Sequence, residues 1–504
     1  MHMDLDIGWL LQCLERFIAG GKYGIDFYES NPPLSFLIYL PTLPLYSYLP
    51  ISPQVSVLIT FAGYMTIANF TIYKLFKHLD YEISEICIII AALIIAQSWV
   101  AGISFGSKDH LIFVFLPAIC LLQYMITINK KPSTAIMILA IIMGGIAICL
   151  KPYYAIVPAL FFAHRLFISR SLVKTIISPD FIGMLIIGLL YLGFIYLFTP
   201  EYINIIMPEL TPIYGLDKPF PIFTRLNYLI YAGIAAILGF FITKSHANNT
   251  KMQHVIFACV GLSIACTIPY YIQQKGFHYH AIPLLSFAMV ALFLGCFATA
   301  KTFLRHNDLS LWVACAVIAV LSLSFTTGGK YKYLTNGQFT AQPLVETIDD
   351  LAWNKTYATY DMKQMLSALP YISNLKNGSR FGHIWGVHGL SIKMKTVSDE
   401  QEKQAIKAQM LGYVDMMAQD MLRYKPSVII IPRYSKPNTN DNNNNNNYLK
   451  FLMSSESFKN SMQNYIFEAS IPFDTTLTGT SYDPEKIVVH DVYVLKEDHN
   501  FINK

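Results

Sequence analysis

Long runs of apolar residues alternate with short polar loops through most of the chain. Between residues 33 and 326 these runs are about 16–22 residues long, and a helix of about 20 apolar residues crosses the hydrocarbon core of a bilayer. From residue 327 onward, charged and apolar residues mix as they do in a water-exposed domain. The pattern predicts a polytopic α-helical membrane protein with a small C-terminal α/β domain outside the bilayer.

We expect about ten spanning helices, which place the transmembrane domain at residues 53–326. They are, in chain order, 54–74, 84–104, 110–128, 133–150, 153–168, 181–199, 226–243, 253–272, 281–300 and 309–326. Lysine and arginine collect in alternate loops, and cytoplasmic loops are the ones that retain positive charge. The loops that carry this charge contain Lys74 and Lys77, Lys130 and Lys131, Arg165 to Lys174, Lys244 and Lys251, and Lys301 and Arg305.

Residues 1–52 differ from the spanning region, because they combine two short apolar segments with several acidic residues. Residues 9–19 show an amphipathic helical pattern. Leu34–Tyr48 is short for a span and contains Pro41 and Pro44, which would leave helix hydrogen bonds unmade in lipid. We expect both segments to be juxtamembrane helices at the outer surface, facing the same side as residues 327–504.

The acidic residues of this region are Asp4, Asp6, Glu15, Asp26 and Glu29. One interpretation is helix capping, with Asp6 as the N-cap and Gly20 or Gly21 as the C-cap. Capping does not explain the second acidic pair, which directly precedes Pro32 and Pro33.

The order and spacing of three segments resemble the C-type superfamily of membrane glycosyltransferases. These segments are Asp6-Ile7-Gly8-Trp9, Gly20-Gly21-Lys22-Tyr23 and Glu29-Ser30-Asn31-Pro32-Pro33-Leu34. Looser similarity continues at Lys108-Asp109-His110, Lys151-Pro152-Tyr153 and residues 274–280. The resemblance is to bacterial relatives of the protein O-mannosyltransferases and the lipid A aminoarabinose transferase.

The resemblance implies an inverting enzyme of the bacterial inner membrane. Such an enzyme moves a sugar from a polyprenyl-phosphate donor to an envelope glycan, lipid or protein on the outer face. It implies that Asp6 is the base that accepts the acceptor's proton. Asp26 and Glu29 are then candidates for orienting the acceptor or for holding a divalent cation.

Basic groups at the outer ends of the expected helices are candidates for binding the donor phosphate. They are Lys108, His110, Lys151, Lys275, His278 and His280. The alternative for each lysine is a side chain that reaches the interface without a ligand. Phe277 and Tyr279 would line the path of the sugar or lipid. Two histidines two residues apart are a weak signal for a metal.

Two outer segments have open interpretations. The loop 200–225, with Glu201, Glu209 and Asp217, is either a lid over the acceptor or a structured spacer. The segment 382–388, with His383 and Trp385, either lines a carbohydrate surface or forms a turn around a packed tryptophan.

The expected elements of the C-terminal domain alternate between strands and helices. The strands are 356–360, 380–385, 427–432 and 487–495, and the helices are 342–352, 361–369, 398–423 and 447–459. Residues 438–447 are almost all asparagine and predict a disordered loop.

Composition removes several other classes of function. The chain of 504 residues is 54% hydrophobic and 14% charged, which excludes an ordinary soluble enzyme. A net charge of +5, spread over loops, disfavours nucleic acid as a partner. No glycine-rich nucleotide loop appears, so a nucleotide-sugar donor is disfavoured. The eight cysteines lack metal-ligand spacing and are expected to be small core residues.

Two rival hypotheses remain. A transporter of lipids or small solutes would place ionisable groups near the bilayer midplane, on broken helices and often in repeated halves. The other rival is an inactive, truncated relative that acts as an assembly partner, because members of the family carry a spanning helix before the acidic loop and residues 1–52 do not.

Overall fold

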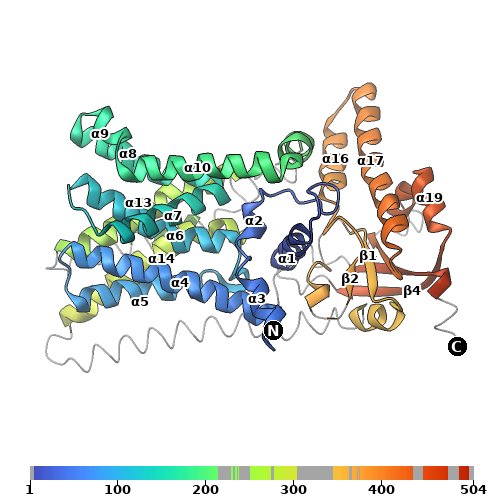
Figure 1. Cartoon of the computed structure of the whole chain (residues 1–504), viewed down its shortest axis with the longest axis horizontal. Helices are drawn as coiled ribbons and strands as arrows, with labels where there is room; N and C mark the ends of the chain where they lie inside the picture. Colours follow the sequence, from blue (N-terminus) through green and yellow to red (C-terminus); the bar gives the residue numbers. More distant parts are fainter. Residues whose placement is uncertain are drawn as a thin grey trace. The chain divides into compact units, whose positions relative to one another are not determined.

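The computed structural model describes residues 5–213, 250–273, 277–303, 344–361, 366–371, 375–434, 447–474 and 487–498, with a few isolated positions between them. The chain divides into two compact units (Figure 1). The helical unit comprises residues 57–198 and 218–328. The α/β unit comprises residues 1–56, 199–217 and 329–504, so it joins the N-terminal segment to the C-terminal domain.

The helical unit consists of apolar helices joined by short turns. Its described helices are α4 (Pro53–His78), α5 (Ile83–Trp99), α6 (Lys108–Thr127), α7 (Thr134–Leu150), α8 (Ile156–Ser169), α9 (Leu172–Ile176), α10 (Pro179–Phe198), α13 (Thr250–Gln273) and α14 (Ile282–Phe303). Polar residues start several of them: Glu82 and Glu85 form a capping box on α5, and the Ser107 hydroxyl caps α6.

Among the described residues, five helices are long and apolar enough to cross a membrane. They are Pro53–His78, Lys108–Thr127, Pro179–Phe198, Lys251–Gln273 and Tyr279–Phe297. Ile83–Trp99 and Thr134–Leu150 are apolar but shorter, and α8 has 14 residues. The expected span 309–326 and most of 226–243 lie outside the described residues. The structure therefore supports a membrane protein with several spans and does not establish the number ten.

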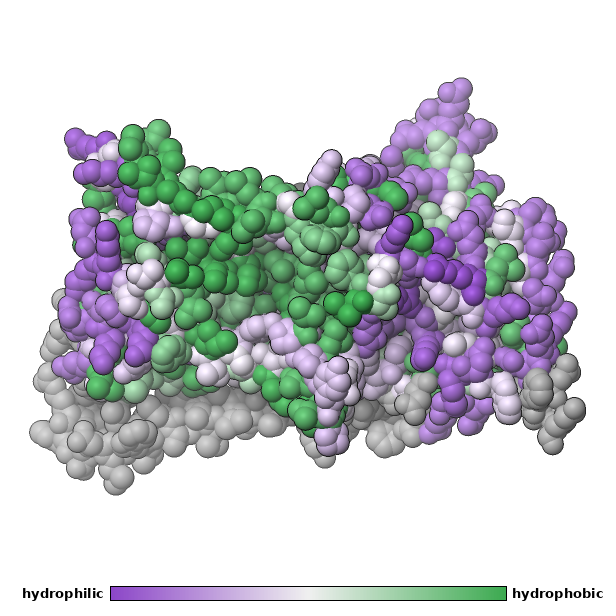
Figure 2. Space-filling model, viewed as in Figure 1, coloured by the Kyte–Doolittle hydropathy of each residue, from purple (hydrophilic) through white to green (hydrophobic). Residues whose placement is uncertain are grey.

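The surface of the helical unit is largely apolar. Figure 2 shows hydrophobic side chains covering its helices, whereas the surface of the α/β unit is largely hydrophilic. On α10, Leu190 and Leu197 are 69% and 71% exposed. Because water would penalise such a surface and lipid would not, this surface fits a bilayer.

Glycines allow the helices of this unit to pack closely. A Cβ atom at Gly144 of α7 would lie 2.6 Å from Ile119 of α6, and one at Gly183 of α10 would lie 2.6 Å from Ile141 of α7. Small residues at helix contacts are typical of membrane proteins. The close approaches at Gly144 and Gly183 pack α7 against both α6 and α10.

The α/β unit contains a five-stranded sheet with strand order β2-β1-β3-β5-β4. The strands are β1 (Thr356–Thr359), β2 (Lys376–Asn377), β3 (Val428–Tyr434), β4 (Tyr465–Asp474) and β5 (Ile487–Leu495). β1 is parallel to both β2 and β3, while β5 is antiparallel to β3 and β4. The helices of the C-terminal part include a helix at 344–351, which confirms the helix expected at 342–352 over its described residues. The others are α16 (Trp385–Thr396), α17 (Glu400–Tyr424), α18 (Asn447–Leu452) and α19 (Glu456–Met462).

The expected elements of this domain are confirmed in part. Strands at 356–360, 427–432 and 487–495 and the helix at 398–423 are present. The predicted strand 380–385 is wrong, because Phe381 forms a single bridge and α16 begins at Trp385. No α-helix covers the described part of 361–369, and 447–459 forms two short helices. All but one residue of the asparagine tract lies outside the described residues.

The first helix, α1 (Leu5–Ile18), belongs to the core of the α/β unit. Its residues Ile7–Leu14 are all buried, including Gln12, whose amide donates to the Ser367 carbonyl at 2.6 Å. Gly8 approaches the Ala368 backbone, where a Cβ would lie only 2.8 Å away. This differs from the expected amphipathic helix with one polar face. The expected helix 34–48 is also divided, into α2 (Leu34–Leu37) and α3 (Thr42–Tyr48), with Pro41 at the junction.

Candidate functional site

Asp6 lies in the first turn of α1 and is partly exposed. Asp6 lies inside the helix, which begins at or before Leu5, so its expected role as the N-cap is wrong. At the other end, Gly20 has a φ of +86° and ends the helix as expected. Three residues after Asp6, Trp9 packs directly against Gly382. The turn that carries Asp6 therefore adjoins the segment 381–386 of the same unit.

Asp26 forms an ion pair that shapes the N-terminal loop. Its Oδ1 lies 2.7 Å from a guanidinium nitrogen of Arg423, and its Oδ2 accepts a hydrogen bond from the Lys22 N–H at 2.7 Å. Burial acts to raise the pKa of Asp26, but the Lys22 N–H and the Arg423 guanidinium outweigh it and hold the pKa below its usual value. Asp26 is thus a stable carboxylate with structural partners.

This ion pair predicts a pH dependence of stability. Folding lowers the pKa of Asp26, so its carboxylate contributes to the stability of the fold above the unfolded pKa of about 3.9. This contribution is lost as the pH falls through the lower, folded-state pKa. We expect Asp26→Asn to lower the thermal midpoint at pH 6 and to have a smaller effect near pH 3. The effect is modest, because the Arg423 side chain is 51% exposed. An equal loss at both pH values would contradict the assignment.

Glu29 is buried and closes the turn before the double proline. Its Oε1 accepts hydrogen bonds from the Asn31 backbone N–H at 2.7 Å and the Asn31 side-chain amide at 2.5 Å. The Tyr23 hydroxyl donates to the Asn31 carbonyl. These contacts hold Glu29 Oε1 within its own turn. The local fold therefore accounts for an acidic residue at this position.

A third carboxylate, Glu209, lies beside the residue that precedes Glu29. The Tyr28 hydroxyl donates to Glu209 Oε2 at 2.6 Å, and the Tyr413 hydroxyl lies 3.2 Å from the same oxygen. The two hydroxyls are 2.9 Å apart. Burial, followed by the nearby Tyr413 and Glu209, raises the pKa of Tyr28, and burial also raises that of Tyr413. Both tyrosines therefore remain protonated and act as donors.

An aromatic recess adjoins this carboxylate. It holds about 260 Å³ of empty space, part of it open to solvent, and is lined by Tyr28, Ser30, Leu210, Phe381, His383 and Trp385. The Tyr28 N–H donates to the Arg380 carbonyl at 2.7 Å, which pairs the N-terminal loop with the segment that follows β2. Residues from three distant parts of the sequence thus form one site. Aromatic walls beside fixed polar groups suit a small hydroxylated ligand.

The sequence carried a partial signal for this site. Glu209 belongs to the loop 200–225, which we interpreted as a lid or a spacer, and His383 and Trp385 belong to the segment considered for carbohydrate. Tyr28 was overlooked, although it directly precedes Glu29. Nothing in the local pattern joins these segments, because their contacts are between residues far apart in the chain.

In the helical unit, Lys151 is the centre of a buried polar group. Its ammonium lies 2.7 Å from Asp109 Oδ1 and donates to Gln273 Oε1 at 2.7 Å. It also lies 5.7 Å above the Tyr279 ring. The group joins the start of α6, the end of α7, the end of α13 and the 3₁₀ turn His278–Ala281. Lys151 and Tyr279 were predicted, whereas Asp109 and Gln273 were missed.

The remaining phosphate candidates have mixed positions. Lys108 and His110 are buried at the start of α6, where the His110 ring stacks with Phe61 at 5.9 Å between ring centroids. His280 is buried and lies 4.5 Å from the Tyr279 ring. Lys275 and the side chain of His278 lie outside the described residues. The sequence therefore indicated polar residues at these helix ends. It did not indicate that Asp109 balances the charge of Lys151.

The candidate metal ligands and the cysteines can also be placed. Within the ranges that the structure describes, no group of three or more His, Cys, Asp or Glu side chains could hold a metal ion together. Of the cysteines, Cys87 is exposed, Cys296 is partly exposed, Cys315 lies outside the described residues and the other five are buried.

The chain matches no protein-family model, and no curated protein is similar to it.

Proposed function

We propose that the protein is a membrane glycosyltransferase that transfers a sugar from a polyprenyl-phosphate donor to an envelope glycan, lipid or protein. The acceptor's hydroxyl oxygen attacks the anomeric carbon while the bond to the carrier phosphate breaks. The phosphate leaves with the electron pair of that bond, and a carboxylate takes the acceptor proton. The donor would reside in the outer leaflet of the bacterial inner membrane.

The observation that supports this proposal best is the aromatic recess beside Glu209. A carboxylate held by two tyrosine hydroxyls is oriented before a ligand binds, so it can accept a hydrogen bond from a sugar hydroxyl without first being ordered. Trp385 and Phe381 offer flat apolar faces in the same recess. We assign acceptor binding to this recess and keep Asp6, on the adjacent helix, as the base.

The helical unit supplies the reason for a lipid-linked donor. Its apolar surface fits a bilayer, and a buried polar group around Lys151 lies at one set of helix ends, while the buried Arg165–Asp180 pair lies at the other. Because Asp109 neutralises Lys151, we assign Lys151 the role of positioning Tyr279 and Gln273. Lys108, His110, Lys275, His278 and His280 remain the candidates for the phosphate. Polar groups at helix ends favour an enzyme over a transporter, whose ionisable groups lie near the midplane.

Replacing Glu209 tests the recess. Glu209→Gln should reduce sugar transfer by about tenfold or more, because a hydrogen bond to a charged group contributes roughly 1.5–3 kcal/mol. The measurement is mass spectrometry of envelope glycans from cells that lack the gene and carry a plasmid copy of each variant.

Glu201→Gln is the matched control, since Glu201 lies in the same segment, whereas Glu209 is the carboxylate that the Tyr28 and Tyr413 hydroxyls hold. It should leave transfer unchanged. If cells with and without the gene have identical envelope glycans, the proposed function is wrong. If the glycan depends on the gene but Glu209→Gln behaves like Glu201→Gln, the recess is not the acceptor site.

A further inference from the structure

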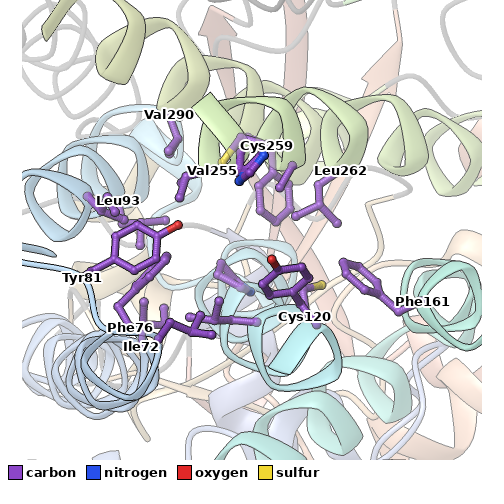
Figure 3. A pocket seen from close by; sticks show the side chains of 18 residues that line it. Ile72, Phe76, Tyr81, Leu93, Cys120, Phe161, Val255, Cys259, Leu262 and Val290 are labelled. Atoms are coloured by element: carbon purple, nitrogen blue, oxygen red, sulfur yellow. The ribbon is translucent and has the colours of Figure 1, made fainter. Parts of the chain in front are cut away.

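An apolar cavity lies inside the helical unit, among α4, α5, α6, α8, α13 and α14. It contains about 790 Å³ of empty space, part of it open to the surroundings. Figure 3 shows side chains such as Phe76, Leu93, Cys120, Phe161 and Leu262 arranged around a single space. Its lining is almost entirely apolar, as is usual for sites that hold the hydrocarbon part of a ligand.

The cavity is separate from the polar group around Lys151. Cys120 follows Asp109 by eleven residues of α6, which is about 16 Å along the helix. On α13, His254 precedes Gln273 by 19 residues, or about 28 Å. The cavity therefore lies toward the other end of the unit, the end that the loop charges assign to the cytoplasm.

The exposed part of the cavity wall lies on two helices. Half of the 18 lining residues are buried, but Tyr124 of α6 is 40% exposed, and His254 and Ala258 of α13 are also exposed. The opening therefore lies between the end of α6 and the first turns of α13. An apolar wall admits hydrocarbon more readily than a polar solute.

Positive charge lies beside the same region. The Lys251 ammonium is 5.4 Å above the ring of Tyr81, which lines the cavity, and it donates to the Asp80 carbonyl at 2.5 Å. Lys130 pairs with the Asp80 carboxylate at 2.6 Å. Lys251 thus places a cation beside a residue of the cavity wall, while Lys130 balances the Asp80 carboxylate next to it. Lysines at a membrane surface attract anionic lipid headgroups.

We propose that this cavity holds an acyl chain of an anionic phospholipid. The chain enters between α6 and α13, and the headgroup phosphate lies near Lys251. The proposal does not depend on sugar transfer, because the residues assigned to that reaction are not among those that line the cavity. It predicts a lipid that is retained when the protein is extracted from the membrane.

Filling the cavity tests the proposal. The full chain, purified in detergent and incubated with either phosphatidylglycerol or phosphatidylcholine, is examined by native mass spectrometry. Wild-type protein should retain one phosphatidylglycerol at a concentration at least fivefold lower than it needs for phosphatidylcholine. Ala258→Trp should lose this complex, because the indole occupies the opening. Ile264→Trp, at a 63% exposed position of the same helix, is the control and should retain it.

Two results would overturn the proposal. One is equal retention of phosphatidylglycerol by the Ala258→Trp and Ile264→Trp proteins. The other is equal retention of the two lipids by wild-type protein, which would remove the role of Lys251 in binding the headgroup. Thermal unfolding of each variant in detergent shows whether the fold is intact. Lys251→Gln leaves the cavity open and tests the headgroup contact on its own. This variant should retain phosphatidylglycerol and phosphatidylcholine equally.

Discussion

Replacing Lys151 with methionine should destabilise the helical unit by about 3–5 kcal/mol, the cost of leaving one member of a buried ion pair without its partner. The Lys151 side chain is 9% exposed and that of Asp109 is not exposed at all. Methionine keeps the length of the side chain but leaves the Asp109 carboxylate without its cation. The measurement is the unfolding midpoint in detergent, followed by size-exclusion chromatography of heated samples.

A double variant separates the ion pair from general disruption. Asp109→Asn combined with Lys151→Met removes both charges, so it should be more stable than Lys151→Met alone. Lys130→Met is the matched control, because the Lys130–Asp80 pair has a similar distance of 2.6 Å but is exposed. Its midpoint should be unchanged. If the double variant were as unstable as the single one, the ion pair would not be what holds these helix ends together.

The long apolar helices could be predicted because length and hydropathy are local properties. The spans at α6, α10, α13 and α14 were placed within a few residues of their observed ends. Strand β5 was predicted with its observed limits, since all its residues except His490 and Asp491 are β-branched, aromatic or aliphatic. Strand β4 was missed because Pro472 and Glu468 interrupt its pattern. Proline is tolerated there because β4 is at the edge of the sheet.

The packing of α1 could not be predicted, because its partners come from the far end of the chain. The amphipathic pattern indicated one apolar face, yet Gln12 is buried and bonded to Ser367, 355 residues later. Arg16 likewise donates to the carbonyl oxygens of Asn377 and Ser379, at 2.7 Å each. A polar residue whose partner is a distant backbone carbonyl gives no local signal.

The candidate site shows the same limit. Asp26 and Glu29 were singled out because acidic residues are unusual beside an apolar protein, but their partners, Arg423 and Asn31, give them structural roles. The position next to them, Tyr28, contacts Glu209. The sequence thus pointed to the loop that contributes to the recess and, within it, to residues adjacent to the one that contacts Glu209.

Replacing Asp6 with asparagine should abolish detectable sugar transfer, because a general base contributes about 10²–10⁴-fold to a rate. The change removes a negative charge near a helix N-terminus, which costs only about 0.3–1 kcal/mol, so the protein should still fold. Glu15→Gln is the control on the same helix. A glutamine there can still accept the hydrogen bond that the Tyr46 hydroxyl donates to Glu15. Transfer is measured in isolated membranes with increasing amounts of acceptor.

The two carboxylates of the α/β unit can then be distinguished by how each variant responds to acceptor. If Glu209 binds the acceptor, the Glu209→Gln protein has a raised KM, and excess acceptor restores most of its rate. If Asp6 takes the proton during attack, no concentration of acceptor restores the Asp6→Asn protein, because the missing step follows binding. A rate for Asp6→Asn within a few-fold of wild type would remove Asp6 from the mechanism. Loss of rate in Glu209→Gln that excess acceptor does not restore would instead make Glu209 the better candidate for the base.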